Sequence, residues 1–371
     1  MELDPENALE SAVFISDEFT ISPKISISGG IRYSFYQMLG PSSIYKYAQG
    51  LPRAFSSITD TLNYGKYDIV ESYSTPEFRL AGRLKIGSNS SLKIGFDQSA
   101  QYIHMISNTT AISPTDIWKL SDPYLLPQKS SQISGGYFLN LRRNTVELSV
   151  EAYYKELQNI IDYKDGAQLL MNEHLEADLL NGTGEAYGVE FMIKKPFGRW
   201  TGWLAYSYSR IFHRVKGNFE NEAINSGNFF PANYDKPHDF KLVNNIKFSR
   251  RVNASATFVY NTGRPITYPV AFYEYQGANR VYYSDRNSYR IPDYARLDLA
   301  ITFNGDMRAE KLNHGSLTFA VYNVLGRKNP YSVFFRSEEG EIKGYKMSIY
   351  GRPIFTLTYN FKIRGNASDD Y

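Results

Sequence analysis

The segment GRPIFTLTYNFKI, residues 351–363, alternates apolar and polar side chains along almost its whole length. Successive side chains of a strand point to opposite faces, so the segment predicts a strand with one apolar and one polar face. The apolar set is Phe355, Leu357, Tyr359 and Phe361, and the polar set is Thr356, Thr358 and Asn360. The apolar face would contact either a protein core or membrane lipid.

The same period of two recurs along the chain and predicts thirteen strands and an all-β, antiparallel fold. Charged residues gather on the polar faces, as in TVELSVEAYYKE at 145–156. The only helix that the pattern predicts is a short one within 167–180. The predicted strands lie near 9–21, 24–38, 76–87, 91–106, 130–142, 145–163, 184–196, 199–213, 237–249, 252–267, 293–305, 315–327 and 348–363.

The connections between these strands alternate between short and long. Every second connection is long, so all long loops would emerge at one end of the sheet and all tight turns at the other. This asymmetry, and strands longer than the usual five or six residues, are typical of a transmembrane β-barrel. A soluble antiparallel sheet with one solvated face alternates similarly and is the alternative at this stage. The long loops are 39–75, 107–129, 164–183, 214–236, 268–292 and 328–347.

The composition gives no support for a nucleic-acid-binding protein and is compatible with a membrane barrel. The 371 residues include 31 Tyr and 23 Phe, no Cys, and a net charge of only +3, which gives no electrostatic case for nucleic acid. The mean hydropathy of −0.41 does not argue against a barrel, whose polar lumen dilutes it. The start, MELDPENALE, lacks the basic and apolar regions of a signal peptide, so a barrel would need an export signal elsewhere.

An ordered series of segments resembles the TonB-dependent receptors of outer membranes, in the form common in Bacteroidetes. The series spans most of the chain and includes the final strand quoted above. Its other members are LPQKSSQISGGY (126–137), GEAYGVEFMIKK (184–195), YDKPHDFKL (234–242), YNTGRPIT (260–267), IPDYARLDLAITF (291–303) and LTFAVYNVLGRKNPYSVFF (317–335).

The resemblance implies a 22-stranded barrel filled by a plug, of which this chain would supply about thirteen C-terminal strands without the plug. Residues 1–363 would be an incomplete transmembrane barrel portion and residues 364–371 a C-terminal tail. The whole receptor would sit in the outer membrane of a Gram-negative cell, bind a scarce solute with extracellular loops, and import it with TonB-transmitted energy. The alternatives are a passive outer-membrane pore or surface adhesin, and a soluble β-rich binding protein.

The resemblance also implies partners. TonB–ExbB–ExbD would act through the missing N-terminal part, the barrel-assembly machinery would read the last strand, and outer-membrane lipid would surround the barrel. A surface lipoprotein is a further candidate partner. We expect no cofactor and no enzymatic activity, because nucleophile elbows, phosphate loops and paired His–carboxylate motifs are missing.

Candidate ligand contacts lie in the expected extracellular loops. Tyr and Arg are enriched at binding hot spots, and loop 268–292 is rich in both, although a loop packed on its own aromatics explains the same composition. Trp118 is either a ligand platform or an interfacial anchor, and His213 with Arg214 would meet an anionic ligand or form part of the rim. The five His residues are too scattered for a metal site. The candidates in loop 268–292 are Tyr273, Tyr275, Arg280, Tyr282, Tyr283 and Arg286.

Overall fold

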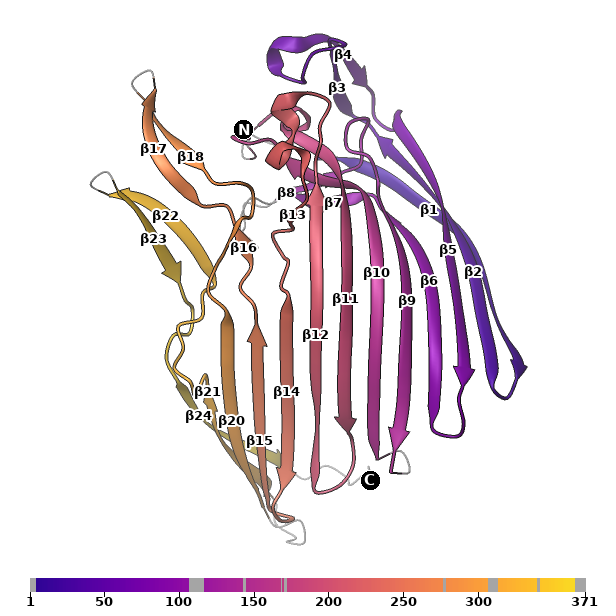
Figure 1. Cartoon of the computed structure of the whole chain (residues 1–371), viewed down its shortest axis with the longest axis vertical. Helices are drawn as coiled ribbons and strands as arrows, with labels where there is room; N and C mark the ends of the chain where they lie inside the picture. The colour runs from indigo at the N-terminus through magenta and orange to yellow at the C-terminus, as the bar shows by residue number, and fades with distance from the viewer. Residues whose placement is uncertain are drawn as a thin grey trace.

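Thirteen long strands form one antiparallel sheet, in which each strand pairs with the neighbours that precede and follow it along the chain (Figure 1). The computed structural model describes residues 5–106, 117–142, 145–167, 169, 172–275, 278–305, 313–338 and 341–363. All thirteen predicted strands are confirmed. They are β1 (Asn7–Ser22), β2 (Ile25–Leu39), β5 (Ile69–Lys85), β6 (Ser90–Gln101), β9 (Gln128–Leu141), β10 (Val146–Tyr163), β11 (Leu179–Lys195), β12 (Trp200–Arg214), β14 (His238–Lys247), β15 (Val252–Asn261), β20 (Tyr294–Asn304), β21 (Asn313–Tyr322) and β24 (Ile354–Ile363).

The long connections contain secondary structure of their own. All of it gathers at one end of the sheet, the long-loop end, while tight turns join the strands at the other end (Figure 1). The predicted loop asymmetry is therefore confirmed. The loop elements are the hairpins β3 (Ser42–Tyr47) with β4 (Ile58–Tyr64), β7 (Ile103–Ile106) with β8 (Ile117–Leu120), β17 (Pro269–Tyr275) with β18 (Ala278–Tyr283) and β22 (Ser332–Glu338) with β23 (Glu341–Met347), and the short pieces β13 (Phe230–Pro231), β16 (Pro265–Ile266), β19 (Tyr289–Arg290), α1 (Leu175–Asp178), η1 (Phe55–Ser57), η2 (Glu220–Glu222) and η3 (Ile224–Gly227).

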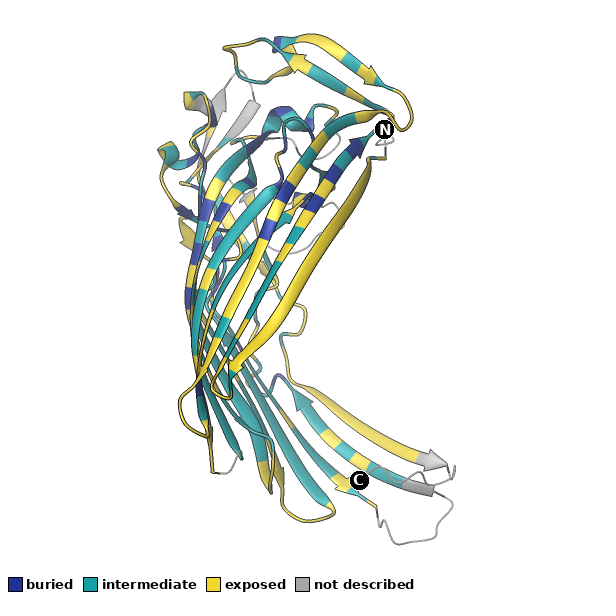
Figure 2. Cartoon of the chain, turned by 90° about the vertical axis from the view of Figure 1, so that its right-hand side faces the viewer, coloured by how far each residue is buried: buried dark blue, intermediate teal, exposed yellow. Residues whose placement is uncertain are grey.

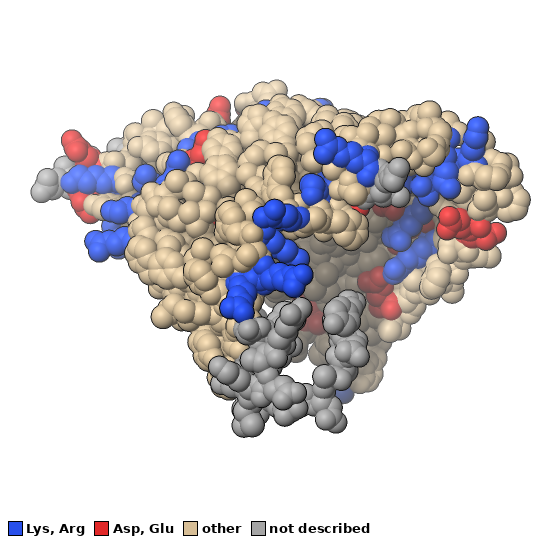
Figure 3. Space-filling view, turned by 90° about the horizontal axis from the view of Figure 1, so that it is seen from below, with Lys and Arg blue, Asp and Glu red and all other residues tan. Residues whose placement is uncertain are grey.

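The strand register places the charged residues of successive strands on one face of the sheet, which we call the polar face. Arg79 pairs across the ladder with Asp97 at 3.0 Å, and Glu147 with Lys194 at 3.3 Å. Leu148, on the opposite face, is flanked by apolar partners on both neighbouring strands. The predicted segregation of charge is confirmed. Seen from the short-turn end, Lys, Arg, Asp and Glu side chains surround the hollow of the molecule (Figure 3).

The sheet is curved and open. β1, at one edge, is exposed along almost its whole length, and β24 forms the other edge (Figure 2). Within the described residues, neither strand pairs with a further strand on its outer side. An unpaired edge leaves backbone N–H and C=O groups without partners, which is costly in lipid. Within the described residues, both edges are therefore open to pairing with a further strand.

The buried core lies at the long-loop end rather than at the middle of the sheet (Figure 2). There the loops pack on the upper parts of the strands and bury three apolar clusters. These clusters position the loop segments that line the cavities described below. Their members are Ile106, Leu125, Leu169, Leu175 and Leu179; Leu180, Val215, Ile224 and Phe230; and Tyr36, Met38 and Tyr102.

Several predicted strand boundaries are wrong, although the short helix predicted within 167–180 is confirmed as the four residues of α1, after which Leu179 begins β11 and is buried in the core. The strand predicted at 91–106 stops at Gln101, where Tyr102 turns its ring onto Tyr36, and residues 103–106 pair with β8 instead. The strand predicted at 348–363 begins only after Pro353, which has no N–H to donate.

Other boundary predictions also differ from the structure. The strands predicted at 76–87 and 184–196 begin earlier, at Ile69 and Leu179. The strands predicted at 252–267 and 315–327 end at Asn261 and Tyr322, where the chain turns into loop structure. The predicted tail, 364–371, lies outside the described residues. No helix in the described ranges is long and apolar enough to cross a membrane.

Candidate functional site

The connection between β6 and β9, residues 102–127, is attached to the polar face by tyrosines; we call it the clamped loop. The Tyr36 hydroxyl donates a hydrogen bond to the Ser121 carbonyl at 2.9 Å, and the Tyr73 hydroxyl donates to the Asp122 carbonyl at 2.8 Å. The Tyr102 ring stacks on Tyr36 with centroids 4.8 Å apart. These contacts hold both described ends of the loop against β2 and β5.

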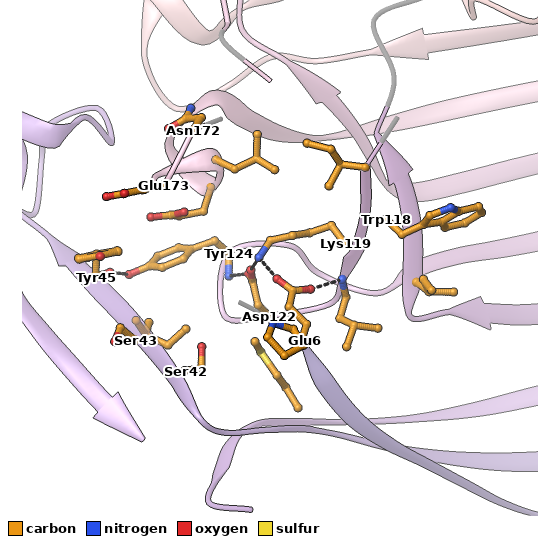
Figure 4. Close-up of a pocket in the computed structure, with 18 of the residues that line it drawn as sticks. Glu6, Ser42, Ser43, Tyr45, Trp118, Lys119, Asp122, Tyr124, Asn172 and Glu173 are labelled. Atoms are coloured by element: carbon orange, nitrogen blue, oxygen red, sulfur yellow. Dashed lines mark hydrogen bonds and ion pairs between the residues drawn. The ribbon is translucent and has the colours of Figure 1, made fainter. Parts of the chain in front are cut away.

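Asp122 and Lys119 organise the far end of the clamped loop (Figure 4). One Asp122 carboxylate oxygen accepts the backbone N–H groups of Tyr124 and Leu125, each at 2.7 Å. The other oxygen lies 3.5 Å from the Lys119 ammonium, which also pairs closely with Glu6. Burial alone would lower the pKa of Lys119, but the two carboxylates outweigh it and raise that pKa.

A cavity of about 650 Å³ opens beside this ion cluster; we call it the vestibule cavity. Its walls come from three separate connections: the β3 strand, the clamped loop and the segment around α1 (Figure 4). Its volume falls in the range of small-molecule sites, which is about 300–1,000 Å³. The described lining includes Glu6, Met38, Ser42, Ser43, Tyr45, Ile103, Trp118, Lys119, Asp122, Tyr124, Asn172, Glu173, Leu175 and Glu176.

Hydrogen bonds between the loops stabilise the cavity walls. The Tyr124 hydroxyl donates to the Tyr45 carbonyl, which joins the clamped loop to β3. The Tyr47 hydroxyl donates to a Glu176 carboxylate oxygen at 2.6 Å, which joins β3 to α1. Burial, and then this hydrogen bond, raise the pKa of Tyr47. The cavity is therefore formed before any ligand arrives.

Three smaller cavities lie on the polar face itself. Their volumes are about 350, 540 and 230 Å³, and Tyr234 lines all three. The first contains His213 and Arg286, while the other two share Glu190. In the part of the chain that the structure describes, no group of three or more His, Asp or Glu residues is arranged to hold a metal ion.

The sequence candidates do not form one site. Trp118 lines the vestibule cavity with its side chain exposed. His213 is buried, with Nε2 3.2 Å from the Tyr234 hydroxyl, and lines a polar-face cavity. Arg214 stacks on Phe229 at 4.6 Å, as a rim residue would.

The aromatic candidates of loop 268–292 lie elsewhere, on the β17–β18 hairpin. Tyr273, Tyr282 and Tyr283 are all exposed there. Tyr275 and Arg280 belong to the same hairpin, but their side chains lie outside the described part of the structure. The hairpin and the vestibule cavity are built from different connections.

Arg286 is separated from these tyrosines and is buried. Its guanidinium contacts Asp162 at 2.8 Å and Asp165 at 2.6 Å, and lies over the Tyr163 ring at 4.3 Å. Burial opposes the charge, but these partners outweigh it and raise the pKa of Arg286. The charged side chain therefore anchors the base of its loop to the top of β10.

The sequence reasoning missed most residues of the vestibule cavity. Glu6, Lys119, Asp122 and Glu176 lie in connections or at a strand entrance, where strand alternation carries no information. The segment SDPY, residues 121–124, holds the one local signal, because Asp before Pro favours a turn in which the side chain accepts backbone N–H groups.

Comparisons with solved structures agree with the architecture. The ferric yersiniabactin uptake receptor FyuA from Yersinia pestis superposes with a TM-score of 0.58 at 16% identity, covering 96% of this chain and 45% of that one. The ferric-catecholate import receptor Fiu from E. coli gives 0.58 at 14% identity, covering 95% and 44%. The ferripyoverdine receptor of the outer membrane of Pseudomonas aeruginosa gives 0.55 at 11%, covering 96% and 38%. At these identities the likeness shows the fold alone.

The chain spans less than half the length of these solved receptors. No curated protein matches the sequence. The family model "TonB dependent receptor-like, beta-barrel" matches residues 4–324, most of the chain. The chain therefore belongs to the TonB-dependent receptor β-barrel family, whose members are outer-membrane proteins.

Proposed function

We propose that this chain forms part of the barrel of a receptor that captures a solute in the vestibule cavity and imports it with energy from TonB. The observation that carries the proposal is the cavity itself, about 650 Å³ in volume, at the long-loop end, which would be extracellular in such a barrel. Met38 is part of its lining and lies on the polar face of β2, which would line the lumen, so a solute in the cavity would already lie above the lumen.

The ordered walls of the vestibule cavity support the capture of a solute that is present at low concentration. Tyr124, Asp122 and Glu176 are each fixed by hydrogen bonds to neighbouring groups, so little side-chain entropy would be lost on binding. The exposed Trp118 would add a flat contact surface at the cavity edge. The alternative is that Trp118 anchors the protein at the membrane interface and does not contact the solute.

In this proposal residues 1–363 are thirteen strands of a 22-stranded barrel, and the remaining strands and the plug complete the receptor. TonB–ExbB–ExbD would act through the plug, the barrel-assembly machinery through β24, and a surface lipoprotein is a further partner to test. The solved structures named above are receptors for ferric chelates, which makes a ferric chelate the first solute to examine.

A cavity-filling substitution tests the proposal in the full-length receptor. Ser42→Trp places an indole in the vestibule cavity, whereas Thr61→Trp adds the same group on exposed β4 outside it. Mass spectrometry of the culture medium would first identify solutes whose depletion requires the receptor. We expect Ser42→Trp to abolish that depletion and Thr61→Trp to preserve it.

Deleting TonB separates the remaining alternatives. A TonB-dependent receptor keeps solute binding in such cells but loses depletion of the medium, whereas a passive pore depletes it equally well and an adhesin never does. Equal depletion by the Ser42→Trp and Thr61→Trp receptors would refute the vestibule cavity as the capture site. The soluble alternative is excluded by the family and its location.

A further inference from the structure

We propose that the vestibule cavity selects a positively charged solute, an organic cation that carries ammonium groups, rather than an anionic ferric chelate. The inference rests on the function proposed above and specifies the substrate class of the same cavity. Four observations support it: the balance of lining charges, the engagement of the single lining lysine, the exposed carboxylate of Glu173, and the aromatic walls.

The described lining of the cavity carries an excess of negative charge. It contains four carboxylates and a single ammonium group, that of Lys119, which leaves three negative charges in excess. The whole chain, in contrast, has a net charge of +3. The negative potential is therefore a local property of the cavity. The carboxylates are Glu6, Asp122, Glu173 and Glu176.

Lys119 is not available to an anion. Its ammonium pairs with Glu6 and lies 3.5 Å from Asp122, and its side chain is only 17% exposed. An anionic solute that recruited this ammonium would displace either the buried Asp122 carboxylate or the half-buried Glu6 carboxylate. Lys119 is therefore a structural part of the cavity wall and does not provide a binding group for an anion.

Glu173 lies apart from the Lys119 ion cluster (Figure 4), and Glu176, in α1, also lines the cavity. Glu173 is exposed and pairs with no cation within the described residues. Glu176 accepts a hydrogen bond from the neutral Tyr47 hydroxyl and forms no ion pair with the Lys119 ammonium, with which it interacts only at longer range. His174, with Nδ1 4.0 Å from Glu176, adds positive charge there only when it is protonated.

The aromatic part of the lining suits the same class of solute. Tyr45 and Trp118 line the cavity, and aromatic faces attract ammonium ions while also packing on apolar stems. The ring of Tyr124, the third aromatic residue of the lining, already carries the Arg53 guanidinium at 5.1 Å. A solute with ammonium groups on a carbon chain would satisfy both kinds of wall. Ferric citrate, an anion, would meet the excess negative charge of the lining instead.

Fluorescence quenching of Trp118 measures the local charge directly. Trp118 is 62% exposed at the cavity edge, so dissolved quenchers reach it. Its signal in the full-length receptor is the difference between the wild type and Trp118→Phe. At low salt we expect caesium to quench roughly two-fold more than iodide, after each is scaled to free N-acetyltryptophanamide, because the negative field concentrates cations.

Variants and a soluble cation complete the test. Glu173→Gln with Glu176→Gln should bring the caesium-to-iodide ratio close to that of the free indole. The matched pair Glu220→Gln with Glu341→Gln changes the net charge equally at exposed sites away from the cavity and should leave the ratio unchanged. Spermidine should protect Trp118 from caesium saturably in the wild type, and ferric citrate should have no such effect.

The outcomes separate this inference from the function on which it rests. Iodide quenching equal to caesium quenching, absence of saturable protection by spermidine, or saturable binding of ferric citrate would each overturn the selection of cations while leaving a solute cavity in place. Unchanged solute depletion by the Ser42→Trp receptor would instead refute the capture site itself.

Discussion

The clamped loop and the β17–β18 hairpin both lie at the long-loop end and contain prominent tyrosines, but the structure holds them differently. In the clamped loop, tyrosine hydroxyls reach backbone carbonyls, and Asp122 accepts two backbone N–H groups. The hairpin is fixed at its base by Arg286 on Asp162, while Tyr273 and Tyr282 are more than half exposed. The base also contacts the neighbouring β22–β23 hairpin, where Tyr268 lies edge-on against Phe335 at 4.9 Å.

This difference shows that a tyrosine-rich loop can either form the wall of a cavity or remain exposed to solvent. A hydroxyl that meets a buried carbonyl immobilises its ring, so the loop encloses a cavity of stable shape. A two-stranded hairpin that stands away from the sheet is only marginally stable by itself. We therefore expect substitutions in the clamped loop and at the anchored base to change stability, and those at the hairpin tip to change little.

Removing the anchor at the hairpin base should have the largest effect. Arg286→Ala leaves the Asp162 carboxylate, 11% exposed, without its cation, which we expect to destabilise the loop base by about 3–5 kcal/mol. Hydrogen exchange of residues 284–291 should accelerate accordingly. Arg336→Ala, on the exposed face of β22, is the control and should change local stability by less than about 0.5 kcal/mol. Similar exchange in the two variants would show that the Arg286–Asp162 contact does not anchor the base of the loop.

Removing the Asp122 carboxylate of the clamped loop should have the second-largest effect on stability. Asp122→Ala removes the acceptor for two buried N–H groups and one partner of Lys119, at an expected cost of about 2–4 kcal/mol. Limited proteolysis between residues 117 and 127 should become much faster. The exposed Asp285→Ala serves as control in the other loop, and faster cleavage there than in the clamped loop would contradict the comparison.

The free energy with which the clamped loop docks on the sheet should also depend on pH. Burial lowers the pKa of His104 to about 4 even though the nearby Asp122 opposes the shift. Above the unfolded pKa, near 6.5, the imidazole is neutral in both states and contributes no pH dependence. As the pH falls from about 6.5 towards 4, the detached loop takes up the proton more readily, so docking should weaken by about 2 kcal/mol at pH 5.

Hydrogen exchange of residues 117–127 at pH 7 and pH 5, corrected for the intrinsic rates, measures this response. His104→Gln should flatten the dependence, because glutamine does not titrate. Residues 278–283 of the hairpin serve as the internal reference. Exchange in the clamped loop that is as insensitive to pH as in the hairpin would show that His104 is not buried as the structure has it.

The smallest expected effect concerns single hydroxyl groups. Tyr36→Phe removes one hydrogen bond to the Ser121 carbonyl and should destabilise the clamped loop by about 1 kcal/mol. Tyr282→Phe, on the exposed hairpin, should be neutral in thermal unfolding of the refolded receptor. A neutral Tyr36→Phe would mean that ring stacking, rather than the hydroxyl, holds the loop.

The sequence by itself determined the barrel. Side-chain alternation is a local property, and each residue of a membrane strand faces either lipid or the polar lumen, so each strand shows the pattern independently. The thirteen strands, their order and the face of residues such as Leu148 and Glu147 could therefore be predicted. Errors are concentrated where a strand passes into a loop, as at Tyr102, because tertiary packing decides where pairing stops.

Only the tertiary structure decided the vestibule cavity and the roles of its residues. The Lys119–Glu6 contact joins residues 113 apart in sequence, and the Arg286–Asp162 contact joins residues 124 apart. Composition marked Arg286 and Tyr282 as equivalent candidates, but one is buried between carboxylates and the other is exposed to solvent. The physical reason is that burial and charge pairing depend on which distant loops pack together, and alternation within one strand carries no record of that packing.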